Sequence, residues 1–220
     1  MRRALSTALV AAAAAVAASP AAATNECRGL QVCIPVAGPW VVATAEQTEF
    51  QLSCPRRFIV AGLDAELSRR GIDVGFVGAL GSPVNPGITT SRDAVFLGRN
   101  LRRGAATFRP HIGCVPASGG GRRTPTAYHA FPPSKPTARR VVNVRLRGGS
   151  AVRRATCARR EVLVNATYAI GFRTAAPPAA ETIAGVRASQ RIKNGVVTLT
   201  VHVPPGARAV AQLDLLCAPR

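Results

Sequence analysis

Aromatic residues make up only 5% of this 220-residue chain, which contains a single Trp and a single Met. A platform that stacks bases or sugar rings needs several exposed aromatic side chains, so the sequence supports such a surface only weakly. Val, Leu, Ile and Ala supply most of the predicted core, with seven Phe as its bulkiest common residue.

Motifs that carry chemistry are also missing. The sequence contains no CxxC, HxxxH or GxSxG pattern, and its three histidines are His111, His129 and His202. Alternation places His111 and His202 on outward faces of predicted strands, while His129 falls in a Gly/Pro-rich segment. Asp64 and Asp73 are the only acids that flank a turn closely, and we expect them at the surface. We therefore predict no catalytic residue, no metal ligand and no cofactor.

Acidic residues and lysines are scarce, whereas arginine is abundant. Between residues 94 and 160 there are 15 Arg or Lys and no Asp or Glu. Without Arg2 and Arg3 the chain has 27 basic and 10 acidic residues, a net charge near +17. Such an imbalance favours contact with polyanions, including envelope polymers, acidic polysaccharides, anionic lipid surfaces and nucleic acid. A general compositional bias towards Arg accounts for the same charge equally well.

The predicted partner is an anionic cell-envelope polymer or another extracellular protein. Contact between arginines and the phosphates of a nucleic acid would not distinguish one base sequence from another, so a specific nucleic acid is not expected. The sequence leaves the oligomeric state open. The candidate polyanion contacts are Arg122, Arg123, Arg139, Arg140, Arg145, Arg147, Arg153 and Arg154.

Residues 1–23 have the pattern of a cleaved secretory signal. Arg2 and Arg3 precede an apolar run over 8–18, and small residues at 21–23 offer a cleavage site. A run of eleven residues is too short to cross a bilayer, which takes about 20. No later segment is long and apolar enough to do so. The prediction is a secreted or envelope-associated protein without a transmembrane segment in its mature part.

All six cysteines follow this signal: Cys27, Cys33, Cys54, Cys114, Cys157 and Cys217. An even number in an exported chain favours disulfides over metal ligands. Six cysteines allow 15 pairings, and spacing alone does not select one. Cys54 and Cys114 are 60 positions apart, as are Cys157 and Cys217, which suggests that one unit occurs twice. If each copy folds as a unit, each of these two pairs forms a bridge, and Cys27 is left with Cys33.

Short alternating strands separated by Gly/Pro turns predict antiparallel β-sandwiches. Period-two patterns lie over 48–54, 72–78 and 196–203, and apolar strands over 40–44 and 94–98. Residues 64–71 predict one or two helical turns, Gly62 a bulge or turn, and 81–90 an irregular loop. Pro110 cannot donate a ladder hydrogen bond, so the strand over 107–114 is expected at a sheet edge or bulge.

The expected organisation is all-β, with two tandem sandwiches that are each closed by a disulfide. The signal peptide covers 1–23, and the first domain, with the Cys27–Cys33 loop, covers 24–116. A Gly/Pro linker follows over 117–138, and the second domain covers 139–220.

The ends of both units resemble a group of secreted actinobacterial proteins with a "CP-x-G" opening and a closing Cys. The openings here are Cys54-Pro55-Arg56-Arg57 and Cys157-Ala158-Arg159-Arg160, and the closings are Gly113-Cys114 and Leu216-Cys217-Ala218. Arg replaces the usual Gly, and the usual glycine-rich strand keeps only Gly62. The resemblance implies an exported β-protein and assigns no site residue.

Three functional hypotheses follow. The favoured one is a non-catalytic exported module whose basic middle binds an anionic polymer. The second is a secreted hydrolase whose site would combine a histidine with a carboxylate or serine in a hollow. The third is a structural or assembly protein that pairs through a sheet edge.

Overall fold

The structure is a computed structural model that describes residues 24–78, 92–117 and 137–220. The predicted signal sequence, the expected loop over 81–90, His129 and residues 118–136 of the predicted linker lie outside these residues. No helix in the described ranges is long and apolar enough to span a membrane.

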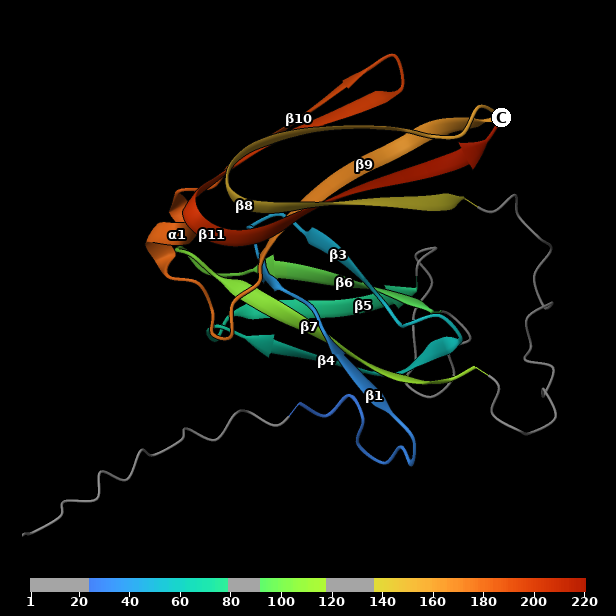
Figure 1. The fold of residues 1–220 in the computed structure, drawn as a ribbon, viewed down its shortest axis with the longest axis vertical. Helices are drawn as coiled ribbons and strands as arrows, with labels where there is room; N and C mark the ends of the chain where they lie inside the picture. The colour runs from blue at the N-terminus through green and yellow to red at the C-terminus, as the bar shows by residue number, and fades with distance from the viewer. Residues whose placement is uncertain (1–23, 79–91, 118–136) are drawn as a thin grey trace, which may run out of the picture.

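The described residues form eleven strands and one short helix (Figure 1). The first half contains β1 (Ile34–Ala37), β2 (Trp40–Val42), β3 (Thr48–Ser53), β4 (Phe58–Leu67), β5 (Ile72–Gly78), β6 (Asp93–Asn100) and β7 (Thr107–Pro116). The second half contains β8 (Ala138–Thr156), β9 (Glu161–Phe172), α1 (Ala180–Ala184), β10 (Arg187–Lys193) and β11 (Val196–Pro219). Every strand pair is antiparallel, as the alternating sequence predicts.

The strands form two sheets, and the larger one joins the two halves of the chain. The larger sheet has eight strands in the order β1-β7-β2-β9-β11-β10, with β4 paired to β7 and β8 paired to β11. The smaller sheet has the order β3-β6-β5. Strand β2 is the link between the halves, because Val41 pairs with Phe108 of β7 and Trp40 with Phe172 of β9.

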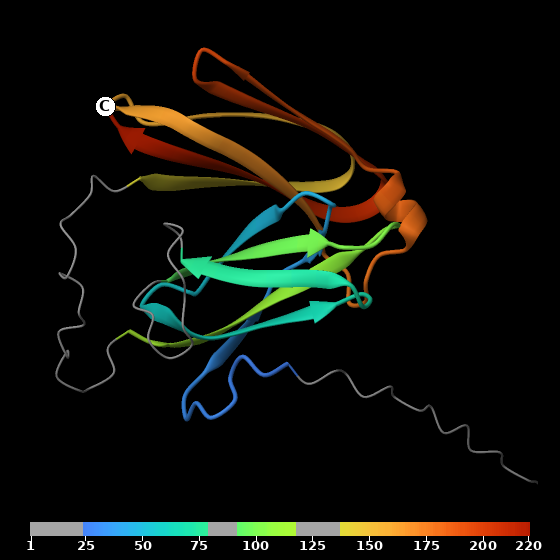
Figure 2. The same ribbon diagram turned by 180° about the vertical axis from the view of Figure 1, so that it is seen from behind.

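The apolar core is divided between the two faces of the larger sheet. Alternate residues of a strand point to opposite faces. Val210 of β11 therefore belongs to a core with Phe96 of the three-stranded sheet. Leu213 belongs to a second core with Leu199. From both sides, β3–β6–β5 lies between the β4–β7 pair and strands β8, β9 and β11 (Figures 1 and 2).

Strands β8 and β11 bend together part-way along their length. The register of this pair shifts between Val203 and Arg208, and Gly148 and Gly149 lie opposite that shift, both with φ 79°. Glycine adopts positive φ with little penalty, so the glycine pair permits the bend. Beyond it, residues 149–156 of β8 and 196–203 of β11 form, with β10, a three-stranded part that we call the outer sheet.

Three disulfides join Cys27 to Cys33, Cys54 to Cys114 and Cys157 to Cys217. These are the pairs that the two equal spacings favoured. Cys54, Cys114 and Cys217 are almost completely buried, and each of the two long-range bridges is packed into one of the two cores. Three disulfides are typical of a protein in an oxidising, extracellular environment.

Most of the strand pairing of the first half recurs in the second half at a constant offset, although β5 has no counterpart at that offset. The cysteines define this offset, since 157 − 54 and 217 − 114 are both 103. The same offset maps β3 and β6 onto the outer sheet, and β2, β4 and β7 onto the inner parts of β8, β9 and β11. Corresponding pairs include Val41–Phe108 with Val144–Ala211, Phe50–Phe96 with Arg153–Leu199, and Leu67–Phe108 with Ile170–Ala211.

A one-residue bulge also recurs beside each long-range disulfide. Ala61 is the extra residue in β4, next to Gly62, where the sequence predicted a bulge or turn. Val164 is the extra residue in β9, again 103 positions later. The pairs that flank the two bulges are Val60–Cys114 with Gly62–Gly113, and Leu163–Cys217 with Asn165–Leu216.

Two local predictions are wrong. Residues 64–71 do not form a helical turn, because β4 continues to Leu67 through its pairing with β7 and only the last four residues bend. Strand β7 is not an edge strand, since β4 lies on one side of it and β1 and β2 on the other. Pro110 is tolerated because the chain breaks between β1 and β2 opposite it. There its carbonyl accepts a hydrogen bond from the Gly38 N–H at 2.7 Å.

Candidate functional site

The eight arginines predicted to contact a polyanion fall into three groups. Arg122 and Arg123 lie outside the described residues. Arg139 and Arg140 form ion pairs with acids of the same chain. The remaining four are exposed, and the described residues place no carboxylate against them: Arg145, Arg147, Arg153 and Arg154.

Arg139 is a largely buried link between the two halves of the chain. Its Nη1 lies 2.8 Å from Oε2 of Glu49 in β3 and also contacts the carboxylate of Asp214 in β11. Burial raises the pKa of Asp214 to about 6, and the guanidinium of Arg139 offsets that effect only in part. The charge of Arg139 is thus paired with two carboxylates of the same chain rather than exposed to a partner.

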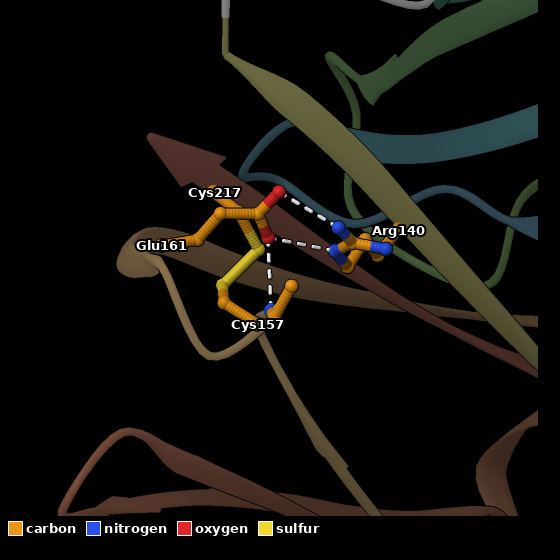
Figure 3. The surroundings of a disulfide bond; sticks show 5 residues. Arg140, Cys157, Glu161 and Cys217 are labelled. Carbon is orange, nitrogen blue, oxygen red and sulfur yellow. Dashed lines mark hydrogen bonds and ion pairs between the residues drawn. A yellow bond between two sulfur atoms is a disulfide. The ribbon is translucent and has the colours of Figure 1, made fainter. Parts of the chain in front are cut away.

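Arg140 binds the carboxylate of Glu161 beside the Cys157–Cys217 disulfide (Figure 3). Its Nε and Nη2 donate to the two oxygens of Glu161 at 2.9 and 2.7 Å, and the backbone N–H of Ala158 donates to the same group. The hydrogen bond from Arg140, followed by that from Ala158, lowers the pKa of Glu161. Glu161 also lies beside Cys157 and Cys217, but those two sulfurs are bonded to each other and offer no thiolate to a metal ion.

The outward face of the outer sheet gathers basic residues from β8 and β10, the two strands that flank β11. Thr198 of β11 pairs with Arg154 of β8 on one side and Arg191 of β10 on the other. Directly paired residues share a face, so the two arginines flank the threonine. Lys193 follows Arg191 on the same face and pairs with Val196. We call the surface formed by Arg154, Arg187, Arg191, Lys193 and Thr198 the basic face.

The basic face includes a shallow hollow of about 430 Å³. Asn194 of the β10–β11 turn completes its wall, and none of the described residues that line it is acidic. Its lining residues are Arg154, Arg191, Lys193, Asn194, Val196 and Thr198.

Sequence reasoning found Arg154 but missed Arg187, Arg191 and Lys193. These residues lie beyond the uninterrupted basic stretch of 94–160. The signal for them was nevertheless present, because Asn194-Gly195 is a two-residue hairpin turn before a clear strand. Such a turn implies a partner strand over 187–193. That strand places the alternate residues Arg187, Arg191 and Lys193 on one face.

His111 lies in the interior, not on the outward face that alternation predicted. It is only 5% exposed, because the segment around Glu26 covers this face of β4 and β7. Its Nδ1 is 3.5 Å from Oε1 of Glu26, and its Nε2 is 3.6 Å from Oε1 of Glu66. Both polar neighbours are carboxylates, so the described residues supply no nucleophile beside this histidine.

His202 is exposed as predicted, on the outward face of the outer sheet. Its Nδ1 lies 3.0 Å from Oγ of Ser150 on the neighbouring strand. Within the described ranges no carboxylate contacts this imidazole to orient it. A serine–histidine pair without that third group on an open sheet face lacks two features of a hydrolytic triad, the orienting acid and a hollow that excludes water.

Comparisons of the chain with protein-family models, with curated protein sequences and with solved structures found no match. The charges and the shape of the molecule itself are therefore the guide to its function.

Proposed function

We propose that this chain is an exported, non-catalytic protein that binds an anionic polymer of the cell envelope or the extracellular space. The signal-like residues 1–23 and the three disulfides support export. The mature part comprises two duplicated β-sandwiches over 24–116 and 139–220, joined edge to edge. The constant offset of 103 in strand pairing, disulfides and bulges supports this duplication.

The observation that carries the proposal is the basic face. Arg154 of β8 and Arg191 and Lys193 of β10 line one hollow across β11, and none of the described residues in its lining is acidic. Like charges held side by side on a surface repel each other, and a bound polyanion relieves that repulsion. Thr198 lies between the arginines and adds a hydroxyl that can donate to a carboxylate or phosphate oxygen.

An extended polymer suits the shape of this surface. The outer sheet is open, its strands end at an exposed hairpin, and Arg187 extends the row of charges along β10. A chain with regularly spaced anionic groups can contact several cations at once. The individual contacts are each weak at an exposed surface, where an ion pair contributes about 0.2–1 kcal/mol. Affinity then comes from their number.

The test uses polygalacturonate as the probe and neutral dextran as its uncharged counterpart. The variant R154Q/R191Q/K193Q removes the three cations of the hollow. The matched control R56Q/R70Q/R103Q removes three exposed arginines of the first half that make no side-chain ion pair within the described residues. Binding is measured by biolayer interferometry at about 50 mM and about 500 mM salt, because exposed charges are screened at the higher ionic strength.

We expect wild type and control to bind polygalacturonate at low salt and to lose most of that binding at high salt. The hollow variant should bind about tenfold more weakly, which corresponds to roughly 0.5 kcal/mol for each cation. Binding that is equal in the hollow variant and the control assigns the effect to overall charge and contradicts the basic face. Binding that is indifferent to salt, or equal for dextran, overturns the polyanion proposal itself.

A further inference from the structure

A second hollow, a groove of about 540 Å³, lies where the two halves of the chain meet. Its floor is the face of β11 that carries Val210 and Gln212, and one wall is β3 from Phe50 to Ser53. The other wall is formed by residues 37–39 between β1 and β2 and by residues 173–175 after β9. The groove is separate from the basic face, since the two hollows share no lining residue.

Three arginines line this groove, and the strand register explains why they meet there. Val210 pairs with Arg145 of β8 on one side and with Gly171 of β9 on the other. Arg173 follows Gly171 by two positions, and its N–H donates to the carbonyl of Arg208. Arg145 and Arg173 therefore border the same stretch of β11 from opposite sides. Arg109 of β7 enters from the first half of the chain.

The positive charge of the groove is largely uncompensated. Arg109 forms an ion pair with Glu66, with its Nη1 at 3.7 Å from Oε2. Its Cζ lies 5.9 Å from the centroid of the Trp40 ring, and its Nε donates to the Gly38 carbonyl. Arg145 and Arg173 are exposed, and the described residues provide neither with a carboxylate. No acidic residue is among the described residues that line the groove. Guanidiniums without a carboxylate partner suit an oxyanion, because each can donate two parallel hydrogen bonds to it.

The rest of the lining has the mixed character that a sugar ring requires. Gln212 is 2% exposed, and its amide is held by the backbone of Gln51 and by Oδ1 of Asn143. The oxygen of Asn143 is thereby occupied, which leaves its N–H groups for a ligand hydroxyl. Ala37 and Leu52, which are not fully buried, supply apolar surface for the C–H face of a ring. A volume of about 540 Å³ falls within the ordinary range of small-molecule sites.

We propose that this groove binds a single sugar unit that carries a carboxylate or phosphate group. Arg145 and Arg173 hold the oxyanion, Asn143 receives a ring hydroxyl, and Gln212 keeps Asn143 in position. The proposal deepens the proposed function, on which it rests for the class of ligand. It adds a site that selects one charged sugar, beside a basic face that responds to the charge density of the whole polymer.

The experiment is isothermal titration calorimetry of the full mature chain with three probes: glucuronate, glucose 6-phosphate and glucose. We expect one or both charged sugars to bind and glucose to bind at least about tenfold more weakly, because it lacks the oxyanion. The variant R145Q/R173Q should lose at least about tenfold in affinity for the charged sugar. R145K/R173K keeps the charge but not the planar fork, so its affinity should lie between those two.

Two further measurements keep the outcomes distinct. R154Q/R191Q/K193Q should bind the charged sugar like wild type, since these residues lie outside the groove. The melting temperature of each variant is recorded, so that a folding defect is not mistaken for a loss of binding.

If neither charged sugar binds, or if R145Q/R173Q binds like wild type, the groove proposal is overturned while polymer binding at the basic face can still hold. If the sugar binds but the polymer does not, the groove stands and the proposed function falls.

Discussion

The side-chain amide of Gln212 pairs with the backbone of Gln51 as a neighbouring strand would. Its Oε1 accepts from the Gln51 N–H at 2.6 Å, and its Nε2 donates to the Gln51 carbonyl at 3.0 Å. Gln212 belongs to β11 and Gln51 to β3, so this contact joins the three-stranded sheet to the second half of the chain. It satisfies two backbone groups that would otherwise be left without a partner at the join.

Replacement of Gln212 by Leu should therefore destabilise the protein. The side chain stays apolar and similar in size, but both backbone groups of Gln51 lose their partner, at roughly 1–3 kcal/mol for each buried group. We expect a loss of about 2–5 kcal/mol in the free energy of unfolding, measured by urea denaturation. The control Q47L changes an exposed glutamine and should stay within about 0.5 kcal/mol of wild type. Equal effects for the two variants would show that the Gln212–Gln51 contact does not hold the halves together.

The raised pKa of Asp214 predicts that its contribution to stability falls as pH rises, the opposite of a carboxylate whose pKa is lowered on folding. The folded chain keeps a proton on this carboxyl up to about pH 6, whereas the unfolded chain releases it near 3.8. The folded state thus binds more protons in this window, and the contribution of Asp214 to the free energy of unfolding falls as pH rises. The shift corresponds to a fall of up to about 3 kcal/mol.

D214N isolates this contribution from the other carboxylates. We expect the difference in unfolding free energy, wild type minus D214N, to fall between about pH 4 and pH 7 in denaturant titrations. D73N removes a carboxylate at an exposed position and serves as the matched control. A wild type minus D214N difference that rises with pH would mean that the pairing with Arg139 outweighs burial.

The sequence predicted what depends on alternation and spacing. Strands β3, β5 and the first part of β11 match period-two segments, and the disulfide pairs match the equal intervals between cysteines. These features follow from local patterning or from the chain's own repetition. Neither requires knowledge of which distant segments meet.

The features that were missed depend on contacts between distant parts of the chain. His111 alternates with apolar residues as an exposed side chain would, but Glu26, 85 positions earlier, covers it. The net charge of the region around Arg139 does not reveal that this arginine forms ion pairs with Glu49 and Asp214. The groove is formed by residues of β3, β8 and β11 whose meeting the linear sequence does not show.

The disulfides that close longer loops should contribute more to stability, because the contribution grows with the logarithm of the loop length. Each of the two long-range bridges has a sequence separation of 60, for which the chain-entropy model gives about 4 kcal/mol. The Cys27–Cys33 bridge has a separation of 6, and the same model gives about 2 kcal/mol. We expect C54A/C114A and C157A/C217A to lower the unfolding free energy by similar amounts, and C27A/C33A by less. Peptide mapping of the unreduced protein checks the pairs themselves, and a Cys54–Cys157 peptide would contradict the fold.

Gly62 illustrates a residue whose identity is set by a tertiary contact rather than by the bulge beside it. A Cβ at this position would lie 1.6 Å from the carbonyl oxygen of Glu26, which is backbone and cannot rotate away. G62A should therefore displace the segment that covers His111, at a cost of about 1–3 kcal/mol. The control is G75A, whose Cβ would meet nothing closer than 4.0 Å. Hydrogen exchange should show faster exchange over residues 25–33 in G62A but not in G75A, and unchanged protection there would show that Glu26 does not press on Gly62.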